Sequence, residues 1–206
     1  MNGRESILAR IRVALADRPP APAAPRAYRL HGTRDAAAVL DLFVDRVRDY
    51  EATVIVTGDP RGEATKAFLE ARARRVGIAA DLDPSLRPKG LDLVEDTLLS
   101  SKDLDALDAA LTTCVAGCAE TGTIALDGGA GQGRRALSLV PDLHVCIVPA
   151  EAIVETVPEM IAALEPSAKG GNPIVLVSGP SATSDIELNR VEGVHGPRQL
   201  VVIVST

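Results

Sequence analysis

The chain has 206 residues, enough to bury a sizeable core, and its length is that of one domain. Its formal net charge is −6 and only 2% of its residues are aromatic, so it lacks the basic face and the stacking aromatic side chains that nucleic-acid binding needs. It contains no apolar run of about 18 residues and no signal-peptide pattern, so we expect a cytoplasmic protein without a membrane span.

Two short segments precede the main part of the chain. Apolar residues recur at helical spacing near the start, which predicts a helix over residues 1–17. Residues 18–27 hold several prolines, which favour an extended linker, so the helix is tethered to the domain rather than built into it. Two interpretations remain: the helix packs on a partner, as in a homodimer that exchanges it, or it is a frayed end. The domain itself is predicted to span residues 28–206.

Helices and short apolar strands alternate in the first part of this domain. The predicted elements are a helix over residues 34–50, a strand over 53–57, a helix over 63–76 and a strand over 78–82. This alternation predicts an α/β fold, with helices packed on a mostly parallel central sheet. The turn that holds Gly58 and Gly62 has no G-x-G-x-x-G or Walker pattern, so we interpret it as a plain connection.

Small residues dominate the middle of the chain. Residues 84–97 are predicted to be irregular, and Ser100-x-x-Asp103 predicts the start of a helix that continues to Leu111. The elements predicted after it are strands over 113–118, 123–127 and 144–148, a glycine loop over 128–133 and a helix over 157–164. The cysteines fall in these strands, and without a C-x-x-C pattern or an iron–sulfur ligand run we expect buried, reduced thiols. They are Cys114, Cys118 and Cys146.

The C-terminal part predicts a strand, a polar loop, a short helix and a second strand. The strands are the apolar runs 174–177 and 200–204, and the helix, near 185–192, begins at the capping box Ser184-x-x-Glu187. In open α/β sheets, ligands bind where such loops leave the carboxyl ends of strands. The loop is therefore a candidate anion site, with a capped turn that binds nothing as the alternative. Its candidate binding residues are Ser181, Thr183, Ser184 and Asp185.

Asp185 has a less certain role than the hydroxyl residues beside it. Its carboxylate would oppose a bound anion, although it could complement the helix dipole or hold a cation instead. A metal site would need clustered ligands, and Asp185, Glu187 and His195 are the sole plausible group in the sequence. Because their spacing is not typical of metal ligands, no metal site is predicted.

Glu120 is the most suggestive single residue. It lies among Ala, Thr and Gly between two apolar strands. A carboxylate held in an apolar turn would have a raised pKa and could act as acid, base or nucleophile. Thr121 and Thr123 would orient it or bind substrate. The alternative is a glutamate at the end of a strand that faces solvent.

Two arginines and one histidine complete the candidates. Arg134 and Arg135 follow the glycine loop, where a guanidinium can bind a carboxylate or phosphate through two hydrogen bonds, or can simply be solvated. His195 could act as a catalytic acid–base group, or could donate a hydrogen bond within a turn. His31, in a loop, and His144, at the start of a strand, are poor candidates.

Two separate motifs resemble one protein family. They are GPSATSDIE followed by GVHGPRQLVVIV near the C-terminus, and GCAETGTIALD with GRRALSLVPDLHVCIV over residues 117–148. Together they resemble the LUD-domain family, whose namesakes are the lactate utilisation protein C proteins of LutC/YkgG type. The resemblance implies a three-layer α/β/α fold of the NagB/RpiA/CoA-transferase-like superfamily. In its CoA-transferase branch a Glu in a Glu-x-Gly setting attacks an acyl-CoA. Glu120-Thr121-Gly122 is similar but departs in the middle residue, and no CoA-binding glycine signature precedes it.

The resemblance also implies a function. In the family this protein acts with iron–sulfur partner proteins that oxidise L-lactate to pyruvate. We therefore expect an accessory subunit that binds a small carboxylate or supports the complex and has no cofactor of its own, with the iron–sulfur clusters in its partners. The alternatives are a stand-alone CoA-transferase-like or sugar-phosphate/folate-type enzyme using Glu120, and a purely structural adaptor. We expect one cleft to be lined by Glu120, Arg134, Ser181, Thr183, Asp185 and His195.

Overall fold

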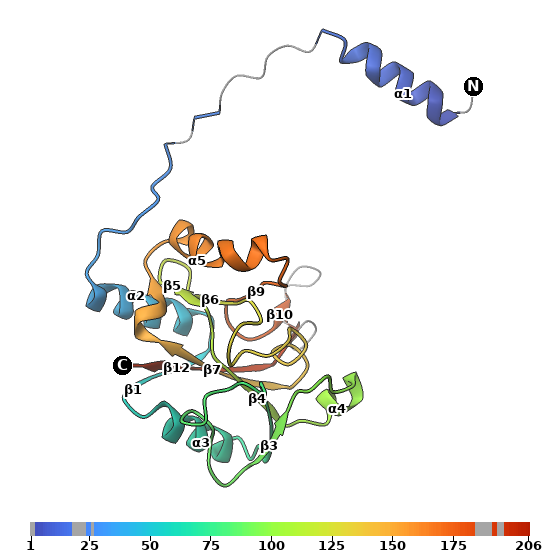
Figure 1. The fold of residues 1–206 in the computed structure, drawn as a ribbon. Coiled ribbons are helices and arrows are strands. Elements are labelled where there is room, and N and C mark those ends of the chain that lie inside the picture. Colours follow the sequence, from blue (N-terminus) through green and yellow to red (C-terminus); the bar gives the residue numbers. More distant parts are fainter. Residues whose placement is uncertain (1–2, 18–23, 26, 184–190, 193–195) are drawn as a thin grey trace.

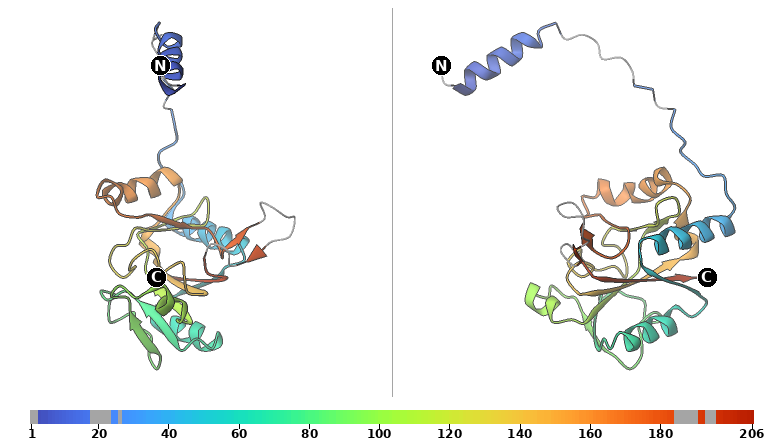
Figure 2. Two further views of the ribbon diagram at one scale, coloured as in Figure 1. Left: turned by 90° about the vertical axis from the view of Figure 1, so that its right-hand side faces the viewer. Right: turned by 180° about the vertical axis from the view of Figure 1, so that it is seen from behind.

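The computed structural model describes residues 3–17, 24–25, 27–183, 191–192 and 196–206. The N-terminal helix α1 (Gly3–Ala14) has no buried residue and stands apart from the folded part of the protein in all views (Figures 1 and 2). No helix among the described residues has the length and apolar character required to cross a membrane.

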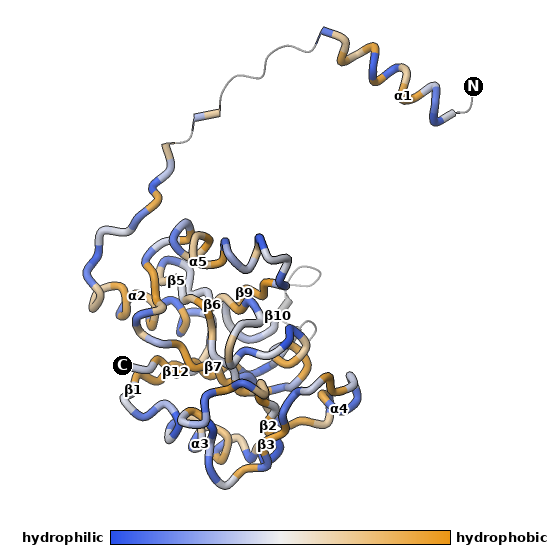
Figure 3. Tube along the Cα trace, in the orientation of Figure 1, coloured by the Kyte–Doolittle hydropathy of each residue, from blue (hydrophilic) through white to orange (hydrophobic). Residues whose placement is uncertain are grey.

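A six-stranded, all-parallel sheet forms the centre of the fold, which confirms the predicted α/β class. Its strands run in the order β1 (Thr53–Thr57), β12 (Gln199–Ser205), β7 (Leu143–Pro149), β4 (Ala109–Thr112), β2 (Arg75–Ile78) and β3 (Asp92–Glu95). The strand β12, which is last in the sequence, lies between β1 and β7 and pairs Val202 with Val54 and with Cys146. Figure 3 shows the hydrophobic residues concentrated along these central strands. Burial on both faces explains why they read as continuous apolar runs.

Each face of the central sheet is covered by a different layer. Helix α3 (Pro60–Glu70) packs on one face through Ala64 and Phe68. Helix α2 (Ala36–Asp49) packs on the other through Val39, Phe43 and Val47. Successive residues of a strand point to opposite faces of the sheet, so alternate residues along each strand contribute to the two cores.

A second, four-stranded sheet shares the α2 face. Its order is β8 (Ile153–Val154), β5 (Ala116–Cys118), β6 (Thr123–Leu126) and β9 (Val175–Val177), with β5, β6 and β9 antiparallel. Helix α5 (Val157–Lys169) covers its outer side through Met160 and Leu164 (Figure 1). The fold therefore has the expected three layers, and the small sheet and α5 are added to them on the α2 side. The short elements are α4 (Ser101–Asp105), the 3-10 turn η1 (Ala150–Ala152) and the antiparallel pair β10 (Ala182–Thr183) and β11 (Val191–Glu192).

Helix starts follow the local sequence closely. Asp35 accepts from the N–H of Ala38, and Asp59 accepts from the N–H of Gly62 ahead of α3, which starts at Pro60. The predicted Ser100/Asp103 cap is confirmed as a capping box, and a second box joins Thr156 to Glu159 at the start of α5. These side chains accept from N–H groups that have no partner within the helix.

Helix ends are predicted less well. The helix expected to reach Leu111 ends at Asp105, and Ala109–Thr112 is instead the buried strand β4. Helix α3 ends at Glu70 rather than residue 76, because Arg72 takes a positive φ of 58° and Val76 enters β2. The region expected to be irregular contains β3. The predicted helix near 185–192 lies largely outside the described residues, and its last two positions form β11.

The cysteines are free thiols, with Cys118 and Cys146 buried and Cys114 partly buried. Cys146 and burial together raise the pKa of the Cys114 thiol well above its ordinary value. We therefore interpret these residues as inert parts of the packing.

Candidate functional site

Glu120 lies at the turn between β5 and β6, beside the N-terminal arm, which we define as residues 27–34. The guanidinium of Arg29 forms an ion pair with its carboxylate, whose side chain is 30% exposed. The Glu120 N–H donates to the carbonyl of Glu155 at 3.0 Å. The apolar setting expected for this carboxylate is thus replaced by an ion pair, and Arg29 would have to move before Glu120 could attack a substrate.

Glu155 holds the arm in place, and the sequence analysis did not find it. Its side chain is 3% exposed and accepts from the N–H groups of Thr33 and Arg34 at 2.6 and 2.7 Å. The guanidinium of Arg34 adds a bond of 2.7 Å, and that of Arg29 one of 3.3 Å. The N–H of Arg34 is the main cause of a lowered pKa at Glu155, with burial opposing it. The signal in the sequence was weak: a glutamate in the apolar run that precedes the second capping box.

A series of hydroxyl groups connects the Glu120 turn to the C-terminal loop. The Oγ1 atoms of Thr121 and Thr123 lie 2.8 Å apart, and Thr123 Oγ1 lies 2.8 Å from Ser178 Oγ. The two predicted threonines therefore bond each other, and Thr123 also bonds Ser178, the first residue after β9. Their present role is to join two adjacent strands.

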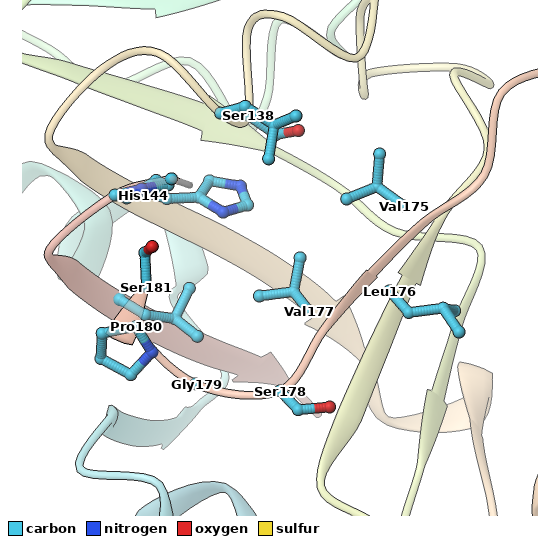
Figure 4. A pocket seen from close by; sticks show the side chains of 13 residues that line it. Ser138, His144, Val175, Leu176, Val177, Ser178, Gly179, Pro180 and Ser181 are labelled. Carbon is cyan, nitrogen blue, oxygen red and sulfur yellow. The ribbon is translucent and has the colours of Figure 1, made fainter. Parts of the chain in front are cut away.

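A small cavity lies where the loop after β9 crosses the amino ends of β7 and β12; we call it the His144 cavity (Figure 4). Its volume is about 150 Å³. The side chains that shape it include Ser138, His144, Val175, Val177, Ser181 and Leu200. Figure 4 shows the imidazole of His144 facing Val175 and Val177, and the Ser178 hydroxyl pointing away from it. The predicted loop residue Ser181 thus lines a cavity.

His144 is the titratable side chain of this cavity among its described lining residues. It is 1% exposed, and its Nε2 lies 2.8 Å from Thr112 Oγ1 on β4. Burial lowers its pKa to about 4, so the imidazole is neutral at neutral pH. From the sequence we set His144 aside because it lies at the start of a strand, and its partner Thr112 is 32 residues away. One histidine in an otherwise apolar strand was the available signal.

A larger cavity, of about 430 Å³, lies beyond the carboxyl ends of β2 and β3; we call it the carboxyl-edge cavity. Arg134 lines it and donates from Nε to Asp96 Oδ2 at 2.7 Å and from Nη2 to the carbonyl of Leu99. The Asp96 side chain is fully buried, whereas that of Arg134 is 36% exposed. The charge of Arg134 is therefore offset by its own neighbour.

Two further carboxylates in this cavity bind the glycine loop. Asp81 accepts from the N–H of Gly131 at 3.1 Å, and Asp127 accepts from that of Gly129 at 2.9 Å. Burial raises the pKa of Asp127, but hydrogen bonds from Ser167, Gly129 and Gln132 outweigh it and leave the pKa below its ordinary value. The loop N–H groups that would bind an anion are thus occupied by negative side chains.

The predicted residues do not all meet in one place. Arg134 and Ser181 line different cavities, and Glu120 lies beside the arm. The single cleft that we expected is therefore not formed by these three residues. Arg135 is exposed, with its carbonyl accepting from Ser138 Oγ at 3.1 Å. Thr183 belongs to β10, and the positions outside the described residues are Ser184, Asp185, Glu187 and His195.

Comparison with known proteins identifies this arrangement. The fold defines an α/β protein whose parallel sheet is covered on both faces. The model of the LUD domain matches residues 28–205, so the chain belongs to the LUD-domain family, and the resemblance seen in the sequence is confirmed.

Two relatives come from Deinococcus radiodurans. A protein named lactate utilization protein C is 46% identical over 186 residues, covering 89% of this chain and 87% of that protein. The crystal structure of a DUF162 family protein matches with a TM-score of 0.74 and 40% identity, over 84% of this chain and all of that one. A lactate utilization protein C from Halalkalibacterium halodurans is 39% identical over 90 residues, 42% of this chain and 39% of that protein.

Proposed function

We propose that this protein is a cytoplasmic component of a lactate-utilisation system, that it acts with iron–sulfur proteins that oxidise L-lactate to pyruvate, and that it binds a small carboxylate in the His144 cavity. The observation that carries the proposal is the 46% identity with a protein named lactate utilization protein C, over nearly the full length of both proteins. The iron–sulfur partners follow from the family resemblance.

The size of the His144 cavity supports a ligand of this class. An apolar cavity of about 150 Å³ holds a molecule of about six non-hydrogen atoms, such as benzene. L-lactate and pyruvate have the same number of such atoms. The carboxyl-edge cavity is larger, and the carboxylates of Asp81 and Asp127 would repel an anion there.

The binding site is tested by filling the cavity from Gly196. A Cβ atom at this position would lie 3.5 Å from Ser181 Cβ and 3.8 Å from Leu139 Cδ2, which is ordinary contact. Gly196→Ala should therefore be tolerated, whereas the longer side chain of Gly196→Leu should enter the cavity. The two variants differ only in how far they reach into the site.

The assay is growth on L-lactate of a Deinococcus radiodurans strain that lacks its lactate utilization protein C and expresses this protein instead. The wild type and Gly196→Ala should restore growth, and Gly196→Leu should not, although it accumulates as folded protein. No growth with the wild type would argue against the role in lactate utilisation. Equal growth with both variants would remove the cavity from the proposal.

The partners are tested separately. Affinity purification of the tagged protein from lactate-grown cells should enrich proteins that contain iron and acid-labile sulfide. The matched control is the same purification from cells grown on glucose with equal expression of the tagged protein. Recovery of the tagged protein without such partners under both conditions would contradict the proposed complex.

A further inference from the structure

The His144 cavity contains no fixed charge among its described lining residues, which consist of Ser, Gly, Pro, Val and Leu side chains and His144. This is unusual for a site that takes an anion, since such sites place an Arg, a Lys or a helix N-terminus against the ligand. The inference that follows rests on the proposed function, because it concerns the ligand of the same cavity.

Charged groups that the structure describes around the cavity do not alter this balance. From the start of β12, Arg198 bonds Asp142 at 2.6 and 2.7 Å, so these two charges compensate each other at the surface. From the segment before β7, Arg135 is exposed and turns only its carbonyl to Ser138. From β4, the group that faces His144 is the neutral hydroxyl of Thr112. The next titratable side chain along β7 is the buried thiol of Cys146.

An anion that binds in such a site needs a positive charge that the site acquires when the anion binds. A carboxylate that leaves water for an uncharged cavity loses its hydration, and buried groups generally avoid this cost by taking up a proton. His144 can accept one proton, and the serine hydroxyls cannot. The described lining of the cavity can therefore balance one negative charge and no more.

We propose that the His144 cavity binds small monocarboxylates together with one proton, held on the imidazole of His144, and rejects dicarboxylates and phosphate esters. The proton is transferred from solvent to the imidazole nitrogen, and no bond of the carboxylate ligand forms or breaks. A second carboxylate or a phosphate dianion would carry a charge for which the described side chains of the cavity offer no partner. Lactate and pyruvate are accepted by the same rule, so the cavity selects by charge and size.

The sign of the pH dependence follows from the two states of His144. In the empty cavity burial holds the pKa of His144 at about 4. A carboxylate in contact favours the charged imidazole and raises that pKa by about 1–3 units. Between the two values, binding takes up a proton, so the affinity should rise about tenfold for each unit by which the pH falls.

The test is titration calorimetry of the full-length protein with L-lactate. At about pH 5.5, inside the window between the two pKa values, heats measured in cacodylate and in MES, which differ in ionisation heat, give the number of protons taken up. We expect uptake of a large fraction of one proton per lactate, affinity that increases by up to about tenfold per unit as the pH falls from about 7 towards 5, and at least tenfold weaker binding of succinate. Lactate binding without proton uptake, or succinate binding as tight as lactate, would overturn the proposal.

Three variants locate the proton. His144→Asn should remove the pH dependence and the proton uptake, whereas His31→Asn, at a side chain that is 84% exposed, should keep both. If His195→Asn removes them instead, the assignment to His144 is wrong. Should His144→Asn fail to fold, the wild-type proton count and the succinate comparison still decide. Absence of lactate binding at every pH would reject the proposed carboxylate function itself, which is a different result from binding without a proton.

Discussion

Gly122 provides a quantitative test of how the Glu120 turn is built. It has a φ of +60°, and a Cβ atom there would lie 2.7 and 2.8 Å from the carbonyl carbon and oxygen of Arg46 and 2.9 Å from the backbone nitrogen of Val47. The left-handed conformation costs an L-residue about 1–2 kcal/mol. Displacing the backbone of α2 adds about 1–3 kcal/mol, as overpacking does elsewhere. Gly122→Ala should therefore destabilise the domain by about 2–5 kcal/mol.

The assay is urea unfolding followed by circular dichroism, with thermal melting as a second measurement. For a protein of this size, the expected loss corresponds to a fall in Tm of about 4–20 °C. Gly90→Ala is the matched control, because Gly90 has a φ of +74° but no atom within 4 Å of the added Cβ. It should cost about 1–2 kcal/mol from backbone strain alone. Equal destabilisation by both substitutions would show that contact with α2 contributes nothing.

The remaining predictions concern the core, the ion pair of the buried Asp96 with Arg134, and the arm. Phe43→Ala should cost about 3–5 kcal/mol in urea unfolding, because Phe43 is fully buried; a loss below about 1 kcal/mol would mean that the site collapses. Asp96→Asn should cost about 2–3 kcal/mol, since it leaves Arg134 without its anionic partner, and an unchanged urea midpoint would contradict this. Glu155 has a lowered pKa, so its stabilising effect is present above its ordinary pKa and lost as pH falls through the folded value. Wild type should therefore exceed Glu155→Gln in Tm at pH 6, with the gap closing below about pH 4; a gap that widens would refute the assignment. Deletion of residues 1–24 should leave Tm unchanged within about 1 °C, because α1 buries nothing.

Strands were predicted correctly where every residue of a short run favours a buried strand. TVIVT and LVVIV are apolar and β-branched, and they form the adjacent strands β1 and β12. The segment of residues 109–111 was assigned to the end of the helix that begins after Ser100, but it forms most of strand β4. Parallel pairing with Val76, Ile78 and their neighbours on β2 decided that it became β4. Local preference yields to tertiary pairing when the segment is short and fully buried.

Candidate binding residues were harder to assign than strands. Arg134 was selected as a ligand for anions, but Asp96, which is 38 residues away, neutralises it. Ser181 was selected for its hydroxyl and does line a cavity. His144 was set aside and lies in the same cavity. The type of side chain indicates what chemistry a residue can do, whereas its partners decide what it does here.

The sequence by itself determined the layer architecture, the helix starts and the family, because hydrophobic periodicity, capping side chains and motifs are properties of neighbouring residues. Only the tertiary structure decided that Arg29 pairs with Glu120, that Glu155 holds the arm, and that Thr112 meets His144 in an uncharged cavity. Those contacts join residues that are far apart in the sequence. Their charges and burial are therefore set by the packing of whole elements and cannot be read from local sequence.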